Sequence, residues 1–260
     1  MKPNWNYSVS LKELQVPTGG KLQGRLATVD DETGQILGTV SPRYNLIQNR
    51  TLHEAMTEVG EQMSMKLNKV EVCSARRFTV FNYSLGEDRD ITIEGSSTTE
   101  DKIRFGFHVV NTFDSRLGPG YFRAFANRLV CLNGLVVPKE IRKFSFREVN
   151  FFNDPVTTKN RLQLQLTPIF NTAKTWSAWA KAIPNRNRIE DFLTTGFSKK
   201  TTKKLMKSYD ESADHSIWGL YNVLTYHITH DATCKNPENL QLKQWDLENR
   251  ISKLYKKDLC

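Results

Sequence analysis

Five lysines lie close together in the segment KKTTKKLMK: Lys199, Lys200, Lys203, Lys204 and Lys207. Their spacing predicts one basic face on a helix that begins after Ser198, which is a suitable N-cap residue. Clustered lysines repel one another, and a bound polyanion would relieve that repulsion. A run of charge is also typical of a plain solvated face. The pattern therefore leaves two interpretations open, nucleic-acid contact and a solvated helix.

Two further segments combine arginine with an aromatic side chain. Arg43 and Tyr44 follow Pro42 at a predicted junction between a strand and a loop. Arginine suits phosphate contact and an aromatic ring suits base stacking, but an arginine paired over a ring is an equally good structural explanation. The second segment is a Gly-Pro-Gly hairpin tip with Arg116 before it and Tyr121 and Arg123 after it. It indicates either a nucleic-acid contact or a hairpin with solvated arginines.

The segment RLVCLNGLVV places polar residues inside an apolar, β-branched run. Arg128 is costly to bury unpaired, so it faces solvent, a carboxylate such as Asp114 or Glu140, or a phosphate. Cys131 lies among leucines and valines, which favours a buried structural thiol over a nucleophile. Asn133 and Gly134 are typical of a turn or bulge that ends the strand.

The chain carries no recognisable catalytic or cofactor motif. The sequence contains no phosphate-binding Walker loop, no GxSxG segment and no dinucleotide-binding GxGxxG segment. His227 and His230 form an i, i+3 pair on a predicted helix, and zinc would need further ligands from His215, Asp231 or Cys234. We therefore expect no metal, no cofactor and no catalytic residue, and an enzyme with an unrecognised site is a third, less favoured alternative.

The overall charge points to an acidic partner. The 260 residues carry a net charge of +9 with a pI near 9.3, which favours binding to phosphates. No segment has the 18 or so consecutive apolar residues that a membrane span needs, and the first residues lack the apolar core of a secretory signal. Four widely spaced cysteines fit reduced thiols in a cytoplasmic protein. We expect no membrane partner.

The elements that position these residues change in character along the chain. Alternating runs predict a hairpin over 24–40 and a series of antiparallel strands from 69 to about 152. We expect a short strand over 45–49, and a helix over 51–64 with Thr51 as N-cap and Glu54 completing a capping box. From 157 onward the periodicity is helical. The fold class is therefore α+β, mainly an antiparallel sheet with a packed helix over 1–153, followed by a helical part over 154–260 that packs on the same core.

Three segments together resemble a known family, found in phages and plasmids, that is called domain of unknown function 932. They are ILGTVSPRYNLIQN, RLVCLNGLVV and SIWGLYNVLTYHITH. The matching positions are Gly38, Val40, Arg43, Tyr44, Gln48 and Asn49, then Arg128, Val130, Cys131, Asn133 and Leu135, then Trp218, Asn222, Thr225 and Tyr226. Val223 stands where the family more often has alanine, and RKFSFREVN replaces an Arg-His-Thr segment. The resemblance implies an origin in a phage, prophage or plasmid, and no activity.

The function that we favour from these observations is non-catalytic binding of nucleic acid, with single-stranded DNA preferred, in replication, recombination or annealing. The alternative is a protein of a mobile element that binds a host protein, for example to inhibit an antiviral defence system. Homo-oligomer formation is left open by the sequence. The residues expected to contact nucleic acid are Arg43, Tyr44, Arg116, Tyr121, Arg123, Arg128, Lys199, Lys200, Lys203, Lys204 and Lys207.

Overall fold

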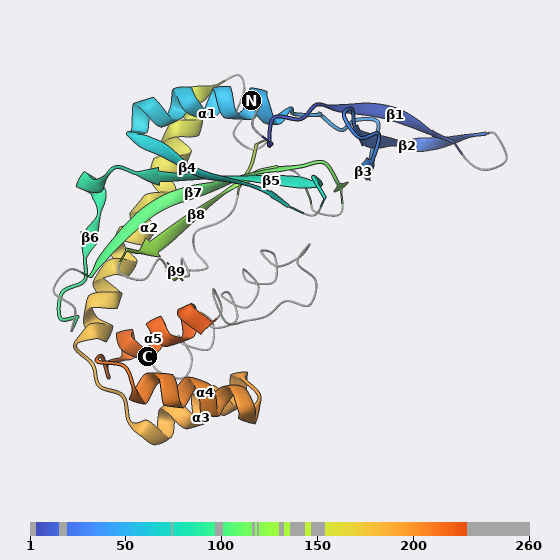
Figure 1. The fold of residues 1–260 in the computed structure, drawn as a ribbon. Helices are drawn as coiled ribbons and strands as arrows, with labels where there is room; N and C mark the ends of the chain where they lie inside the picture. Colours follow the sequence, from blue (N-terminus) through green and yellow to red (C-terminus); the bar gives the residue numbers. More distant parts are fainter. Residues whose placement is uncertain are drawn as a thin grey trace. The chain divides into compact units, whose positions relative to one another are not determined.

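A computed structural model describes residues 4–15, 20–73, 75–96, 101–115, 118, 120–129, 133–135, 144–146 and 154–227. Antiparallel strands and one helix precede a run of helices (Figure 1), which confirms the α+β prediction. No helix in the described ranges is both long enough and apolar enough to cross a bilayer. The strands are β1 (Val9–Gln15), β2 (Lys21–Asp30), β3 (Ile36–Val40), β4 (Met65–Cys73), β5 (Phe78–Leu85), β6 (Ile91–Thr92), β7 (Lys102–Thr112), β8 (Tyr121–Arg128), β9 (Asn133–Leu135) and β10 (Phe144–Ser145). The helices are α1 (Asn49–Met63), α2 (Pro155–Ala180), α3 (Arg186–Gly196), α4 (Lys199–Asp210) and α5 (Ile217–Tyr226).

The chain forms two compact units, and neither is one continuous segment. The first unit contains residues 1–86, 106–123 and 143–163, and the second contains 87–105, 124–142 and 164–260. Strands β7 and β8 and helix α2 contribute residues to both units. The site residues are therefore described below within the unit to which each belongs.

A three-stranded sheet, in the order β1-β2-β3, begins the first unit. The predicted hairpin over 24–40 is confirmed by the pairing of β2 with β3. Residues 21–25 of β2 are exposed and residues 27–30 are buried, so only one end of this sheet joins the core of the unit. At that end Thr28 donates a hydrogen bond to the Phe113 carbonyl at 2.6 Å. A Cβ at Gly38 would lie 2.6 Å from the Asp114 Cα, so only glycine allows this close approach.

The segment before α1 differs from the sequence prediction. Residues 45–48 are not a strand, and α1 begins at Asn49, with Gln48 as N-cap and no side-chain cap. The Gln48 carboxamide accepts from the Val9 amide at 3.1 Å and donates to the Val9 carbonyl at 2.7 Å. These two side-chain hydrogen bonds satisfy the Val9 backbone in the way that a paired strand would. Glu54 pairs with Arg50 at 2.8 Å instead of completing a capping box with Thr51.

The larger sheet runs in the order β10-β8-β7-β5-β4, with β6 paired to β7 and β9 paired to β8. Helix α1 packs against β4 and β5 (Figure 1). The Asn133-Gly134 pair, predicted to be a turn or bulge, lies instead at the start of β9, where Asn133 pairs with Arg128 and Gly134 with Asn127. Pairing to β8 gives these residues backbone partners that a sequence pattern does not reveal.

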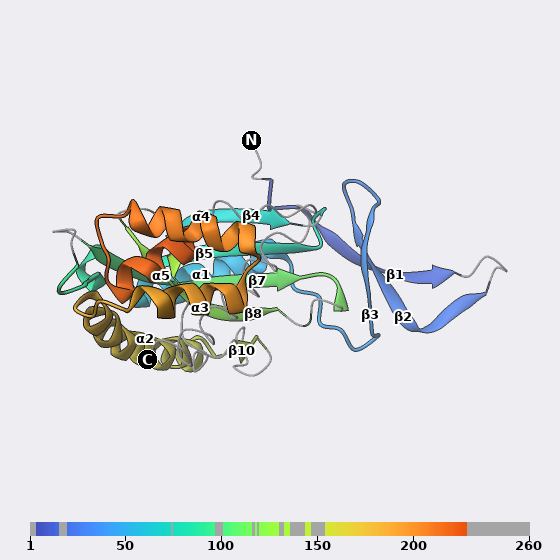
Figure 2. The ribbon, with the colours of Figure 1, turned by 90° about the horizontal axis from the view of Figure 1, so that it is seen from below.

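Helices α3, α4 and α5 follow one another in the second unit and pack in sequence order (Figure 2). Each begins with a side chain that accepts a backbone N–H: Asn185 for α3, Ser198 for α4 and Ser216 for α5. The predicted cap at Ser198 is thereby confirmed. Helix α5 is apolar and buried over most of its surface. Trp176 and Trp179 of α2 contact its rings, with centroid distances of 5.7 Å to Trp218 and 5.5 Å to Tyr221.

Candidate nucleic-acid interface

The lysines of α4 lie on the solvent side of an amphipathic helix. Thr202, Leu205, Met206 and Tyr209 form the buried side of α4. The five lysines at 199, 200, 203, 204 and 207 are all exposed, and we call them the lysine face. The five lysines therefore lie on the exposed side of α4, as their helical spacing in the sequence predicts.

Two lysines of the lysine face lie where positive charge is least favourable. Lys199 and Lys200 occupy the first turn, which has no acidic residue, and the helix N-terminus already carries a partial positive charge. Lys207 has a carboxylate partner, Glu211, at 3.7 Å. Among the described residues, Lys199, Lys200 and Lys203 have no salt bridge. This arrangement costs the free helix stability and favours a bound anion.

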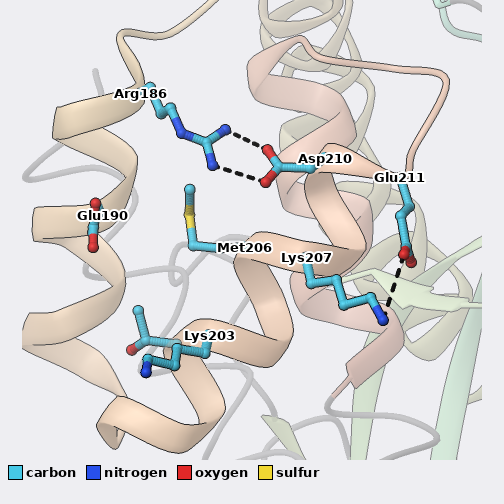
Figure 3. A pocket seen from close by; sticks show the side chains of 8 residues that line it. Arg186, Glu190, Lys203, Met206, Lys207, Asp210 and Glu211 are labelled. Atoms are coloured by element: carbon cyan, nitrogen blue, oxygen red, sulfur yellow. Dashed lines mark hydrogen bonds and ion pairs between the residues drawn. The ribbon is translucent and has the colours of Figure 1, made fainter.

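A cleft of about 400 Å³ opens between α3 and α4 (Figure 3). Lys203 and Lys207 belong both to the lysine face and to the lining of this cleft. At one end Arg186 donates two hydrogen bonds to Asp210, one of them from Nη2 to Oδ2 at 2.8 Å. These hydrogen bonds hold the pKa of the Asp210 carboxyl below its usual value. The remaining lining residues are Glu190, Thr202, Met206 and Glu211.

The first unit presents a second set of polar side chains, on the sheet face opposite α1. Thr79 and Tyr83 of β5 face α1, where they bond Asn49 and His53. Asn82 points to the opposite face because side chains alternate along a strand. Its direct partners are His108 on β7 and Lys69 on β4, and Lys66 is paired with Ser84 nearby. Directly paired residues share a face, so these side chains lie together.

Arg123 of β8 joins this sheet face and affects its histidine. Burial, together with a smaller effect of the nearby Arg123 guanidinium, lowers the pKa of His108 to about 3. The imidazole is therefore neutral at physiological pH. We call Lys66, Lys69, Asn82, His108 and Arg123 the polar sheet face. Of these five, the sequence predicted only Arg123 as a nucleic-acid contact. Asn82 and His108 could have been noticed because each is a polar residue that interrupts a mainly apolar strand.

The other predicted contacts of the first unit differ in how accessible they are. Arg43 is exposed, whereas Tyr44 is half-buried and its hydroxyl donates to the Thr112 carbonyl. Tyr121 is 6 % exposed, and burial raises its pKa to about 12, so little of its ring is available for base stacking. Arg116 lies outside the described residues. Nucleic-acid contact by these residues stays a prediction.

Arg128, in the second unit, pairs with Asp101 instead of Asp114 or Glu140. Its Nε lies 2.5 Å from Oδ1 and its Nη2 lies 2.6 Å from Oδ2. The same carboxylate accepts from the Trp218 indole at 2.9 Å and from the Ser96 hydroxyl at 2.7 Å. Burial alone would raise the pKa of Asp101, but these hydrogen bonds and the Arg128 charge hold it below its usual value. The geometry favours the ion pair among the alternatives left open for Arg128, and sequence reasoning missed Asp101.

Several residues of the first and third family-like segments form buried hydrogen bonds, most of them to backbone carbonyls. Asn49 is fully buried, where its amide donates to the Trp5 carbonyl and to Thr79 while its oxygen accepts from Asn111. In α5, Asn222 donates to the Trp218 carbonyl and Thr225 to the Tyr221 carbonyl. These contacts explain why polar residues recur in otherwise apolar segments, and they involve no reacting group.

The described residues contain no group of three or more His, Cys, Asp or Glu side chains placed to hold a metal ion. His230, Asp231, Cys234 and Cys131 lie outside the described ranges. Burial raises the pKa of the Cys73 thiol to about 11, which makes it a poor nucleophile.

Comparison with known proteins gives one assignment. Neither a curated protein nor a solved structure matches the chain. The model of the family described as domain of unknown function (DUF932) matches residues 36–249. That range contains β3 through α5 and therefore both the lysine face and the polar sheet face. Because the match covers well over half of the sequence, the chain belongs to the DUF932 family.

Proposed function

We propose that this protein binds nucleic acid without catalysis, and that its ligand is single-stranded DNA. The lysine face is the observation that carries the proposal. Its ammonium groups are exposed, two of them lie in the first turn of α4 at the positive end of the helix, and Lys199, Lys200 and Lys203 have no salt bridge among the described residues. A backbone of closely spaced phosphates would neutralise several of them at once.

The polar sheet face adds a second feature that suits the same ligand. It combines two exposed lysines with the half-buried amide of Asn82, the half-buried neutral imidazole of His108 and the half-buried guanidinium of Arg123. Such a mixture provides hydrogen bonds to bases as well as charge for phosphates. The role that we propose is binding of single strands in the cytoplasm during replication, recombination or annealing of phage, prophage or plasmid DNA.

Binding of labelled single- and double-stranded DNA across a salt series tests this function. If the five lysines each meet a phosphate, the logarithm of the affinity for single strands should fall with the logarithm of salt concentration with a slope of about −3.5. We expect single strands to bind more tightly than duplexes of equal length. A slope near zero, or no binding at low salt, would refute the proposal.

A second candidate function is binding to a host protein. The observation that favours it is two separate exposed apolar side chains on the small sheet, Leu22 at 44 % and Ile36 at 53 % exposed. If DNA fails to bind, binding of the protein to a host protein should be measured with both residues replaced by Ser. Weaker binding of this variant would support a protein-binding role for the small sheet, and unchanged binding would contradict it.

A further inference from the structure

The cleft between α3 and α4 has a lining that the lysine face alone does not explain. It contains the cations Arg186, Lys203 and Lys207 and the carboxylates Glu190, Asp210 and Glu211. Its volume of about 400 Å³ lies in the range of small-ligand sites. A surface that only attracts phosphates would not need three carboxylates. The cleft therefore fits a ligand with both an anionic part and a hydrogen-bond-donating part.

The cations of the cleft are not equally available. Arg186 is held by two hydrogen bonds from its guanidinium to Asp210, and Lys207 lies 3.7 Å from Glu211. Lys203 has no salt bridge among the described residues, so its ammonium is the one positioned for an incoming phosphate. Because Lys203 also belongs to the lysine face, a strand that follows this face passes the mouth of the cleft.

The carboxylates differ in the same way. Asp210 and Glu211 have the cationic partners given above, whereas Glu190 is exposed and makes no salt bridge or side-chain hydrogen bond with the described residues. A free carboxylate repels phosphate and accepts hydrogen bonds from amino groups. The exocyclic amino groups of cytosine, adenine and guanine are such donors, and thymine has none.

Met206 provides the apolar surface of the cleft. It is 8 % exposed, and its side chain extends from α4 toward α3 (Figure 3). A thioether is soft and polarisable and makes favourable contacts with aromatic rings. The exposed part of Met206 is small, so it suits contact with the edge of a base that lies between Lys203 and Glu190, and not stacking on its face.

We propose that this cleft binds one nucleotide of the single strand, with its phosphate at Lys203, its base against Met206 and an exocyclic amino group at Glu190. The inference rests on the proposed function and adds a preference to it. Bases that carry an amino group are bound more tightly than thymine, and Glu190 determines the difference.

The test compares oligo(dC) and oligo(dT) of equal length by fluorescence anisotropy, at low salt and slightly alkaline pH, where cytosine is neutral. We expect about tenfold tighter binding of oligo(dC), within the range of one good base contact. Glu190→Gln should reduce the preference to less than twofold, since an amide also donates to thymine carbonyls. Asp191→Asn is the matched control, because it removes the same charge from an exposed neighbour that does not line the cleft, and it should retain the tenfold preference.

The outcomes separate the two proposals. If neither oligonucleotide binds, both the function and the cleft proposal fail. If both bind equally, or if Glu190→Gln retains the preference, nucleic-acid binding stands and the cleft proposal fails. An independent readout is the methyl NMR signal of Met206, assigned with Met206→Leu. It should shift on addition of oligo(dC), and an unchanged signal at saturation would overturn the placement of the base.

Discussion

Asp101 and Arg128 form a buried bidentate ion pair in which the carboxylate is fully buried and the guanidinium side chain is 11 % exposed. Arg186 and Asp210 form the same kind of pair at the surface, with side chains 62 % and 39 % exposed. The two pairs have similar ion-pair geometry and differ in burial and in the further hydrogen bonds that Asp101 accepts from Trp218 and Ser96. They therefore offer a matched comparison of what an ion pair contributes in each setting.

Asp101→Asn should lower the free energy of unfolding by about 3–5 kcal/mol, because it leaves the Arg128 charge buried without its partner. Asp210→Asn should lower it far less, because solvent screens the exposed Arg186. Urea denaturation at neutral pH measures both. Equal losses for the two variants would mean that burial of the Asp101–Arg128 pair does not determine its contribution.

Stability should fall between pH 7 and pH 5 because of His108. Its folded-state pKa of about 3 lies below the unfolded value near 6.5, so in this window only the unfolded chain takes up the proton. Acidification then favours unfolding, by about 2 kcal/mol across the window. His108→Gln should flatten this dependence, whereas His215→Gln, at an exposed position, should leave it unchanged. An equally steep profile in the His108 variant would contradict the assignment.

Ala75→Gly should stabilise the protein by about 0.5–1 kcal/mol. Ala75 has φ 50°, a left-handed conformation that costs a residue with a Cβ more than it costs glycine. Arg76→Gly should destabilise, although Arg76 has φ 69°. The reason is that its guanidinium binds Asp30 at 2.8 Å and Glu32 at 2.9 Å and covers the Tyr7 ring. Thermal unfolding of both variants tests this. A higher melting temperature in both would mean that the contacts of the Arg76 side chain contribute less than the backbone strain costs.

Replacing Lys199, Lys200, Lys203 and Lys204 together by Ala should change stability by no more than about 0.5 kcal/mol, because the side chains are solvated and repel one another. The same variant should bind single-stranded DNA at least tenfold more weakly at low salt. The slope of the logarithm of affinity against the logarithm of salt concentration should become less steep by about 3. The control replaces Lys12, Lys21, Lys102 and Lys174, which are exposed elsewhere, and so removes the same net charge. Equal weakening in both variants would indicate that net charge, and not the lysine face, attracts DNA.

Local signals in the sequence were enough to predict the elements that are stabilised by near neighbours. The hairpin over 24–40 and helix α4 are examples, since Gly34 in the turn with φ 72° and the Ser198 cap both act within a few residues. The lysine face was predictable for the same reason. Helical spacing alone places those side chains on one side of α4 and the buried residues Leu205 and Tyr209 on the other.

Only the tertiary structure decided the features that depend on distant partners. The start of α1 was misread as a strand because Gln48 is held by Val9, and Asn49 by Trp5, Thr79 and Asn111. Asp101 meets Arg128 and Trp218 across 27 and 117 residues of sequence. The polar sheet face likewise exists only once the register of β4, β5 and β7 is set, because a slip of one residue would turn Asn82 to the α1 side. Hydrogen bonds and strand pairing over such separations are determined by packing of the whole unit, which no local pattern of residue types encodes.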